Sequence, residues 1–111
     1  MSNRDRPLLA VLIDADNVPA KFASAILDEV KLIGEPALRR VYGDWSSGQL
    51  GKWSDCIRSL GLVAHQDTAT TTGKHATDIA LVNDAMDIVH GQRFDGLVLV
   101  PTDSDFPALA N

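Results

Sequence analysis

Two carboxylate pairs that follow apolar runs are the residues best suited to chemistry. The run 8–13 ends at Asp14-Ala15-Asp16-Asn17, and the run 97–100 leads through Pro101-Thr102 to Asp103-Ser104-Asp105. Apolar runs of this length are typical of strands buried on both faces of a parallel sheet. Open α/β sheets bind their ligands at the carboxyl ends of such strands. Because gathered carboxylates repel one another, the sequence predicts a divalent-cation site there.

A parallel sheet has to position these pairs, and the rest of the chain supplies its elements. We expect strands over about 8–13, 37–42, 62–65 and 97–100, with a helix in each interval. This alternation predicts an α/β fold with right-handed crossovers and a parallel sheet. If the last strand lies beside the first, the strand order is 3-2-1-4. The switch point then brings Asp14, Asp103 and Asp105 to one crevice.

Apolar residues at helical spacing are expected to face the core of this sheet. They are Phe22, Ile26, Val30 and Ile33 in the first helix, Leu50, Trp53, Ile57 and Leu60 in the second, and Ile79, Val82, Met86 and Val89 in the third.

The third helix, expected over about 74–90, adds candidates for the site. Asp78 stands four residues after Lys74, so both side chains lie on one helix face, clear of the apolar stripe. The amino end of this helix is expected at the same sheet edge as the carboxylates. Asp84 faces elsewhere and is predicted to be structural. Thr102 and Ser104 could donate hydrogen bonds to a phosphate, although a turn role fits them equally.

Composition limits the class of protein. The 111 residues, 45% hydrophobic and 23% charged, are ordinary for one soluble globular domain. The single Cys56 cannot form an intramolecular disulfide, and the first apolar run is too short for a signal segment or a membrane span. We therefore expect a cytoplasmic protein that does not contact membranes. With one cysteine and three scattered histidines, no structural zinc site is expected.

The net charge of −5 argues against a nucleic-acid partner, because lysine and arginine drive binding to phosphate backbones. The whole excess can be assigned to the predicted site, however. Once its five aspartates (Asp14, Asp16, Asp78, Asp103 and Asp105) are set aside, ten acidic residues face ten basic ones. The remaining surface is neutral rather than a basic binding face.

Several spaced motifs carry a family resemblance. They are Leu12-Ile13-Asp14-Ala15-Asp16-Asn17, Tyr42-Gly43-Asp44-Trp45, Thr72-Gly73-Lys74, Ala76-Thr77-Asp78, Asp84-Ala85-Met86-Asp87 and Asp103-Ser104-Asp105-Phe106. Together they resemble the NYN domain, a branch of the PIN-like nucleases, and most closely its bacterial LabA-type (DUF88) members. The resemblance implies a PIN-like three-layer sandwich with strand order 3-2-1-4-5. We expect the fifth strand to be missing, so that 8–111 is a domain incomplete at its carboxyl end, preceded by a disordered segment over 1–7.

The same resemblance implies a magnesium- or manganese-dependent ribonuclease. Its metal ligands would be Asp14, Asp78 and Asp103, with Asp105 as a further candidate, while Asn17 and Lys74 would orient carboxylate, water or phosphate. RNA is the implied partner. Family members often continue into a carboxyl-terminal OST-HTH/LOTUS domain that binds RNA, and the sequence leaves a homodimer open.

Two other readings remain open. Asp14-Ala15-Asp16-Asn17-Val18 also fits the nucleophile motif of haloacid-dehalogenase-like phosphatases, in which Asp14 would attack phosphorus and Asp16 would be the general acid. The chain is short for that fold, and Asp78 would have no role in it. The third reading is a module that binds RNA or protein without turnover.

Overall fold

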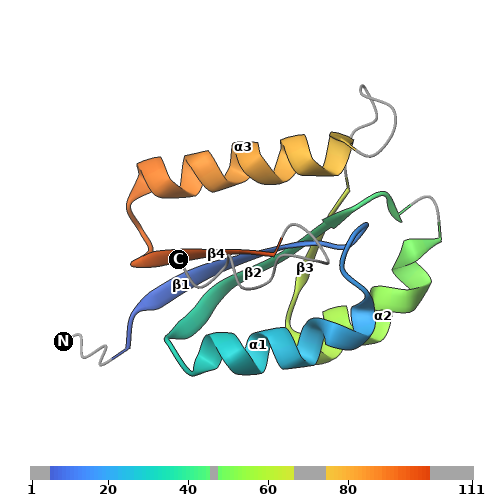
Figure 1. The fold of residues 1–111 in the computed structure, drawn as a ribbon, viewed down its shortest axis with the longest axis horizontal. Helices are drawn as coiled ribbons and strands as arrows, with labels where there is room; N and C mark the ends of the chain where they lie inside the picture. Colours follow the sequence, from blue (N-terminus) through green and yellow to red (C-terminus); the bar gives the residue numbers. More distant parts are fainter. Residues whose placement is uncertain (1–5, 46–47, 67–74, 101–111) are drawn as a thin grey trace.

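The chain folds around a four-stranded parallel sheet that lies between two helical layers (Figure 1). The computed structural model describes residues 6–45, 48–66 and 75–100. The strands are β1 (Leu8–Asp14), β2 (Glu35–Gly43), β3 (Val63–Gln66) and β4 (Gly96–Val100). The helices are η1 (Ala20–Phe22), α1 (Ala23–Lys31), α2 (Gln49–Leu60) and α3 (His75–Gly91). The sheet order β3-β2-β1-β4 confirms the predicted α/β fold with order 3-2-1-4.

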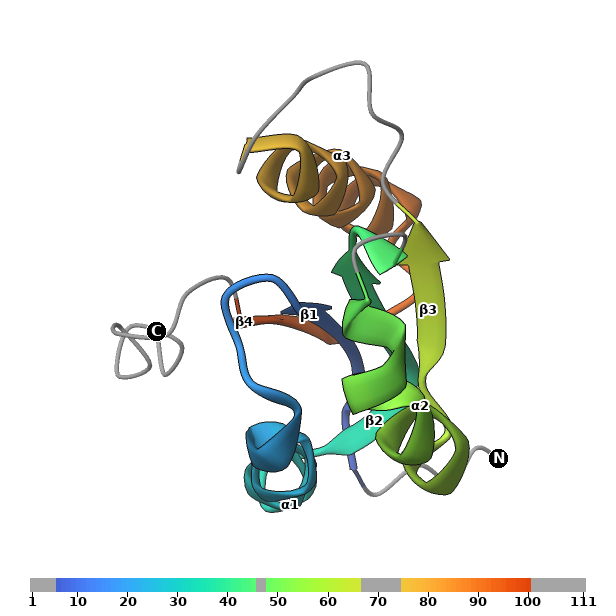
Figure 2. The ribbon, with the colours of Figure 1, turned by 90° about the vertical axis from the view of Figure 1, so that its right-hand side faces the viewer.

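β1 lies in the middle of the sheet, and its side chains alternate between two hydrophobic cores. Val11 and Ile13 pack in the core that contains Trp53 of α2 and the buried face of α1. Leu12 packs on the other face, against Leu81 and Ala85 of α3. Figures 1 and 2 show α1 and α2 on one side of the sheet and α3 on the other. Burial from both sides explains why the run is continuously apolar.

The carboxyl ends of β1 and β4 lie side by side. Ile13 is the register partner of Val100, and Asp14 is the partner of Tyr42 on β2. Because α3 runs antiparallel to the strands, its amino end lies at this same edge of the sheet (Figure 1). The fold therefore directs β1, β4 and α3 to one edge, as the strand order predicted.

The prediction of which face of α3 packs against the core is wrong. Val82, Met86 and Val89 are 51%, 55% and 59% exposed, whereas Leu81 and Ala85 are buried. The helix carries two apolar stripes side by side, and the structure buries the one that contains Leu81. The side chain of Ile79 lies outside what the structure describes.

A cluster of polar side chains between the sheet and α3 explains why the helix buries Leu81 rather than Val82. The Tyr42 hydroxyl donates a hydrogen bond of 2.6 Å to Asp84 Oδ2, and Arg40 Nη1 lies 3.1 Å from the same oxygen. Tyr42 is fully buried, so its hydroxyl requires an acceptor. Turning α3 to bury Val82 would carry Asp84 away from Tyr42. The structural role predicted for Asp84 is confirmed.

The first helix also departs from its predicted stripe. α1 buries Ala23, Leu27 and Val30, while Phe22 and Ile33, at the two ends of the expected stripe, are 40% and 63% exposed. Val30 and the partly buried Ile26 are the predicted residues that do pack against the core. The stripe therefore has the right position along the chain but is rotated toward Leu27.

The second helix follows its prediction. Trp53 is buried, and Ile57 and Leu60 pack partly buried against the same core; the side chain of Leu50 lies outside the described part. Gly61 ends α2 with a φ of +68°, a conformation that glycine adopts without strain. None of the helices in the described ranges is long and apolar enough to cross a membrane.

The disordered segment predicted over 1–7 lies mostly outside the residues that the structure describes, which begin at Arg6. Arg6 is described, and its guanidinium donates hydrogen bonds to the carbonyl oxygens of Lys31 and Gly34. This arginine ties the start of β1 to the end of α1.

Candidate active site

Asp14, at the carboxyl end of β1, is a fully buried carboxylate held in one orientation. Its Oδ1 accepts the main-chain N–H of Asp16 at 3.0 Å, and its Oδ2 accepts the side-chain amide of Asn17 at 2.7 Å. The carbonyl of Asp14 accepts the N–H groups of Asn17 and Val18. This turn, in which a carboxylate bonds to the chain just after it, is the local structure that aspartate favours. The sequence after β1 therefore fixes the carboxylate that precedes it.

Polar side chains link this turn to the ends of the neighbouring strands. Asp16 Oδ1 lies 3.5 Å from the N–H of Asp44, just beyond β2. Gln66, the last residue of β3, donates to Asp44 Oδ1 at 3.3 Å and accepts the N–H of Trp45 at 3.0 Å. Sequence reasoning missed Gln66, because a single amide on a short exposed strand gives no pattern. Asp44 therefore connects the turn after β1 with the end of β3.

The remaining predicted site residues are only partly described. Asp78 lies in the first turn of α3, at the carboxyl edge of the sheet, but its side chain is outside what the structure describes. The other candidates outside the described residues are Lys74, Thr102, Asp103, Ser104 and Asp105. Within the described part of the chain, no group of three or more histidine, cysteine, aspartate or glutamate side chains could hold a metal ion. Of the predicted residues, the structure brings Asp14 and Asn17 into contact.

Comparison with known families identifies the domain. A family model for the NYN domain matches residues 8–111. The chain belongs to the NYN domain family. NYN domains are PIN-like nuclease-type domains, and the parallel sheet of order 3-2-1-4 with three helices is consistent with that fold. No curated protein and no solved structure matches the chain.

Within this NYN domain, the carboxylate of Asp14 is a group that suits a hard cation. NYN and PIN-like nucleases generally use divalent metals. Magnesium and manganese prefer carboxylate oxygens, and a ligand binds best when other groups hold it in place. Asp14 meets both conditions, because Asp16 and Asn17 fix its two oxygens separately. Asp14 is therefore suited to be one ligand of a divalent metal.

Two pockets lie near these elements, and they differ in their relation to Asp14. The first, which we call the loop pocket, has a volume of about 380 Å³. It is lined by Ala15, Asp16, Asn17, Val18, Pro19, Ala20, Lys21, Lys52 and Trp53. Because Asn17 also contacts the Asp14 carboxylate, the loop pocket adjoins the candidate site. Lys21 and Lys52 carried no motif and were missed by sequence reasoning.

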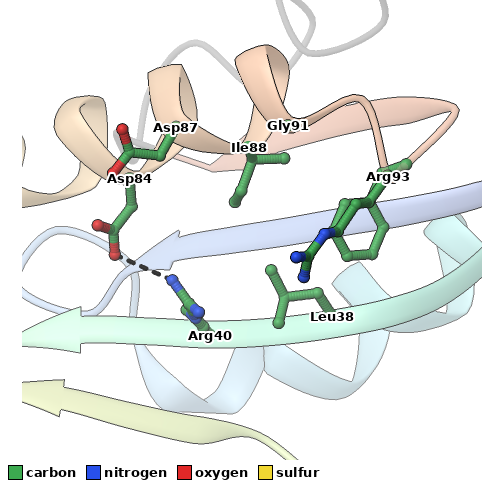
Figure 3. A pocket seen from close by; sticks show the side chains of 8 residues that line it. Leu38, Arg40, Asp84, Asp87, Ile88, Gly91 and Arg93 are labelled. Atoms are coloured by element: carbon green, nitrogen blue, oxygen red, sulfur yellow. Dashed lines mark hydrogen bonds and ion pairs between the residues drawn. The ribbon is translucent and has the colours of Figure 1, made fainter.

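The second pocket, about 370 Å³, lies between β2 and the carboxyl half of α3 (Figure 3). It is lined by Leu38, Arg40, Asp84, Asp87, Ile88, Gly91, Arg93 and Phe94. The hydrogen bond with Tyr42 raises the pKa of Arg40, while burial, followed by the hydrogen bond to Asp84, raises the pKa of the Tyr42 hydroxyl. The Arg40 guanidinium therefore stays charged and the Tyr42 hydroxyl stays protonated at neutral pH. We interpret it as structural.

Proposed function

We propose that this NYN domain is a metal-dependent ribonuclease that hydrolyses RNA phosphodiester bonds. The observation that carries the proposal is the buried Asp14 carboxylate, oriented by Asp16 and Asn17 at the carboxyl end of β1 in a nuclease-type domain. Carboxylates at this edge of a parallel sheet are positioned for a ligand in the crevice beyond the strands.

The proposed metal ligands are Asp14, Asp78, Asp103 and Asp105. Two further observations support them: Val100 is in register beside Ile13, three residues before Asp103, and the helix that carries Asp78 begins at the same sheet edge. A bound Mg²⁺ or Mn²⁺ supplies Lewis acidity toward the phosphate and its attacking water. Asn17 keeps the Asp14 carboxylate turned toward the site. Lys74, Thr102 and Ser104 are proposed to contact the substrate phosphate.

The test is cleavage of a labelled single-stranded RNA by the purified chain with Mn²⁺ or Mg²⁺, with and without EDTA. We expect cleavage that EDTA abolishes and that leaves a 3′-hydroxyl and a 5′-phosphate. Asp14→Asn removes the ligand charge while keeping the shape of the side chain, so it should abolish cleavage and leave the circular dichroism spectrum unchanged. Asp28→Asn, on the exposed face of α1, is the matched control and should cleave as the wild type does.

Undiminished metal-dependent cleavage by Asp14→Asn would refute the assignment. Rapid hydrolysis of p-nitrophenyl phosphate with a trapped aspartyl-phosphate would instead support the haloacid-dehalogenase-like reading. RNA binding without cleavage under any metal would support the module that lacks turnover.

A further inference from the structure

The loop pocket combines features that fit one nucleotide of a polynucleotide chain. Its lining combines apolar side chains, of which the buried Trp53 is the largest, with polar ones, and it brings two lysines to the turn that follows β1. At about 380 Å³ it is near the lower end of ligand pockets, which hold roughly 300–1,000 Å³. A volume of this order suits a ligand unit as small as one nucleotide.

The charges of the pocket favour an anion. Lys21 and Lys52 face one carboxylate, that of Asp16, which lies against the N–H of Asp44. Both lysines are exposed, and Lys21 Nζ stands 5.4 Å from the centre of the Phe22 ring, on the surface of η1. Lys52 lies in the first turn of α2, where the helix dipole adds positive potential. Among the residues that line the pocket, two lysines therefore outnumber one carboxylate, in a chain whose net charge is −5.

The position of the pocket links it to the reaction. Asn17 lines the pocket and also donates to the Asp14 carboxylate, so one side chain connects the pocket with that carboxylate. A phosphate bound by the lysines would belong to the same strand as a phosphodiester at Asp14.

We propose that the loop pocket binds a nucleotide flanking the scissile phosphodiester of single-stranded RNA, with Lys21 and Lys52 contacting its backbone phosphates. This proposal rests on the proposed function for the identity of the substrate. It predicts that substrate affinity comes partly from η1 and α2, on the opposite side of the sheet from α3.

The test measures the dissociation constant of a fluorescent single-stranded RNA as a function of salt concentration. For single strands, the logarithm of the binding constant changes with a slope of about −0.7 per phosphate contact. The double variant Lys21→Ala/Lys52→Ala should therefore reduce the slope by about 1.4. If the two proteins bind equally at 1 M salt, this change in slope makes the double variant bind about 25-fold more weakly than the wild type at 0.1 M salt.

The matched control is Lys31→Ala/Arg58→Ala, which removes the same charge from exposed positions in the last turns of α1 and α2. It should keep the wild-type slope. Equal slopes for the Lys21/Lys52 double variant and the wild type would overturn the proposal, as would an equal loss in the control. Competition by polyglutamate at the same charge concentration as RNA would also overturn it, because the pocket would then bind any polyanion.

The two proposals fail in different ways. If the wild type binds RNA with the lysine-dependent slope but never cleaves it, the proposed function fails and the nucleotide pocket stands. If the wild type cleaves RNA and the double variant keeps both its slope and its KM, the pocket assignment fails and the ribonuclease stands. If the wild type binds no RNA at low salt, both fail.

Discussion

The hydrogen bond from Asn17 to Asp14 gives the sharpest test of how the turn prepares its carboxylate. Asn17→Ala removes the donor that lies 2.7 Å from Asp14 Oδ2 and leaves the Asp16 N–H on the other oxygen. Hydrogen bonds to charged groups contribute about 1.5–3 kcal/mol. Because Asn17 is exposed and water can replace part of its bond, we take the lower value. A loss of about 1.5 kcal/mol lowers Tm by about 6 °C in a domain of 111 residues.

The effect on catalysis should be larger than the effect on stability. Loss of a hydrogen bond that orients the Asp14 carboxylate allows it to shift, and a displacement of about 1 Å near reacting atoms can reduce the rate about 100-fold. We expect kcat for RNA cleavage to fall by about that factor while KM changes less than about threefold. Asn83→Ala, on the exposed face of α3, is the control and should change neither quantity. A kcat for Asn17→Ala within about threefold of the wild-type value would refute the orienting role.

Two further predictions test the fold around the site. Tyr42→Phe should cost about 1.5–3 kcal/mol at pH 8, measured by urea unfolding, because the hydrogen bond to Asp84 is lost. Burial raises the pKa of Tyr42 in the folded state above the usual 10.0, so Tyr42 ionises first in the unfolded wild type as the pH rises. The stability of the wild type therefore falls above pH 10, and the difference in unfolding free energy between the wild type and Tyr42→Phe should narrow. A difference that stays constant from pH 8 to 11 would contradict this. Leu81→Ala should lower the free energy of unfolding by about 2–5 kcal/mol and Met86→Ala by less than about 1 kcal/mol in the same assay. A larger loss for Met86→Ala than for Leu81→Ala would show that α3 buries the face that contains Met86.

The sheet was predictable because continuous apolar runs in the sequence mark its strands. A continuous apolar run marks a strand buried on both faces, and β1 has such a run. The alternation of strands and helices then leaves few topologies, and the resemblance to the NYN domain implied the one with β1 beside β4. The position of Asp14 followed from the end of its strand.

The phase of α3 was not predictable, because two apolar stripes on one helix give no preference. What decides between them is Asp84, through a hydrogen bond to Tyr42 on a strand far away in the sequence. Periodicity within a single segment contains no information about such a partner. The loop pocket was missed for a similar reason, because Lys21 and Lys52 meet only when η1 and α2 pack side by side.

Asp14 and Asp84 show how the same residue type can serve opposite purposes in one domain. Asp84 faces Arg40 at 3.1 Å, so its charge is neutralised by the protein itself, and it fixes a helix on a sheet. Asp14 accepts hydrogen bonds from two neutral donors, the Asp16 N–H and the Asn17 amide, which hold its carboxylate in place. The two residues also differ in their place in the fold, because Asp14 lies at the carboxyl end of β1, the edge at which open α/β sheets bind their ligands. This placement favours a metal-binding role for Asp14.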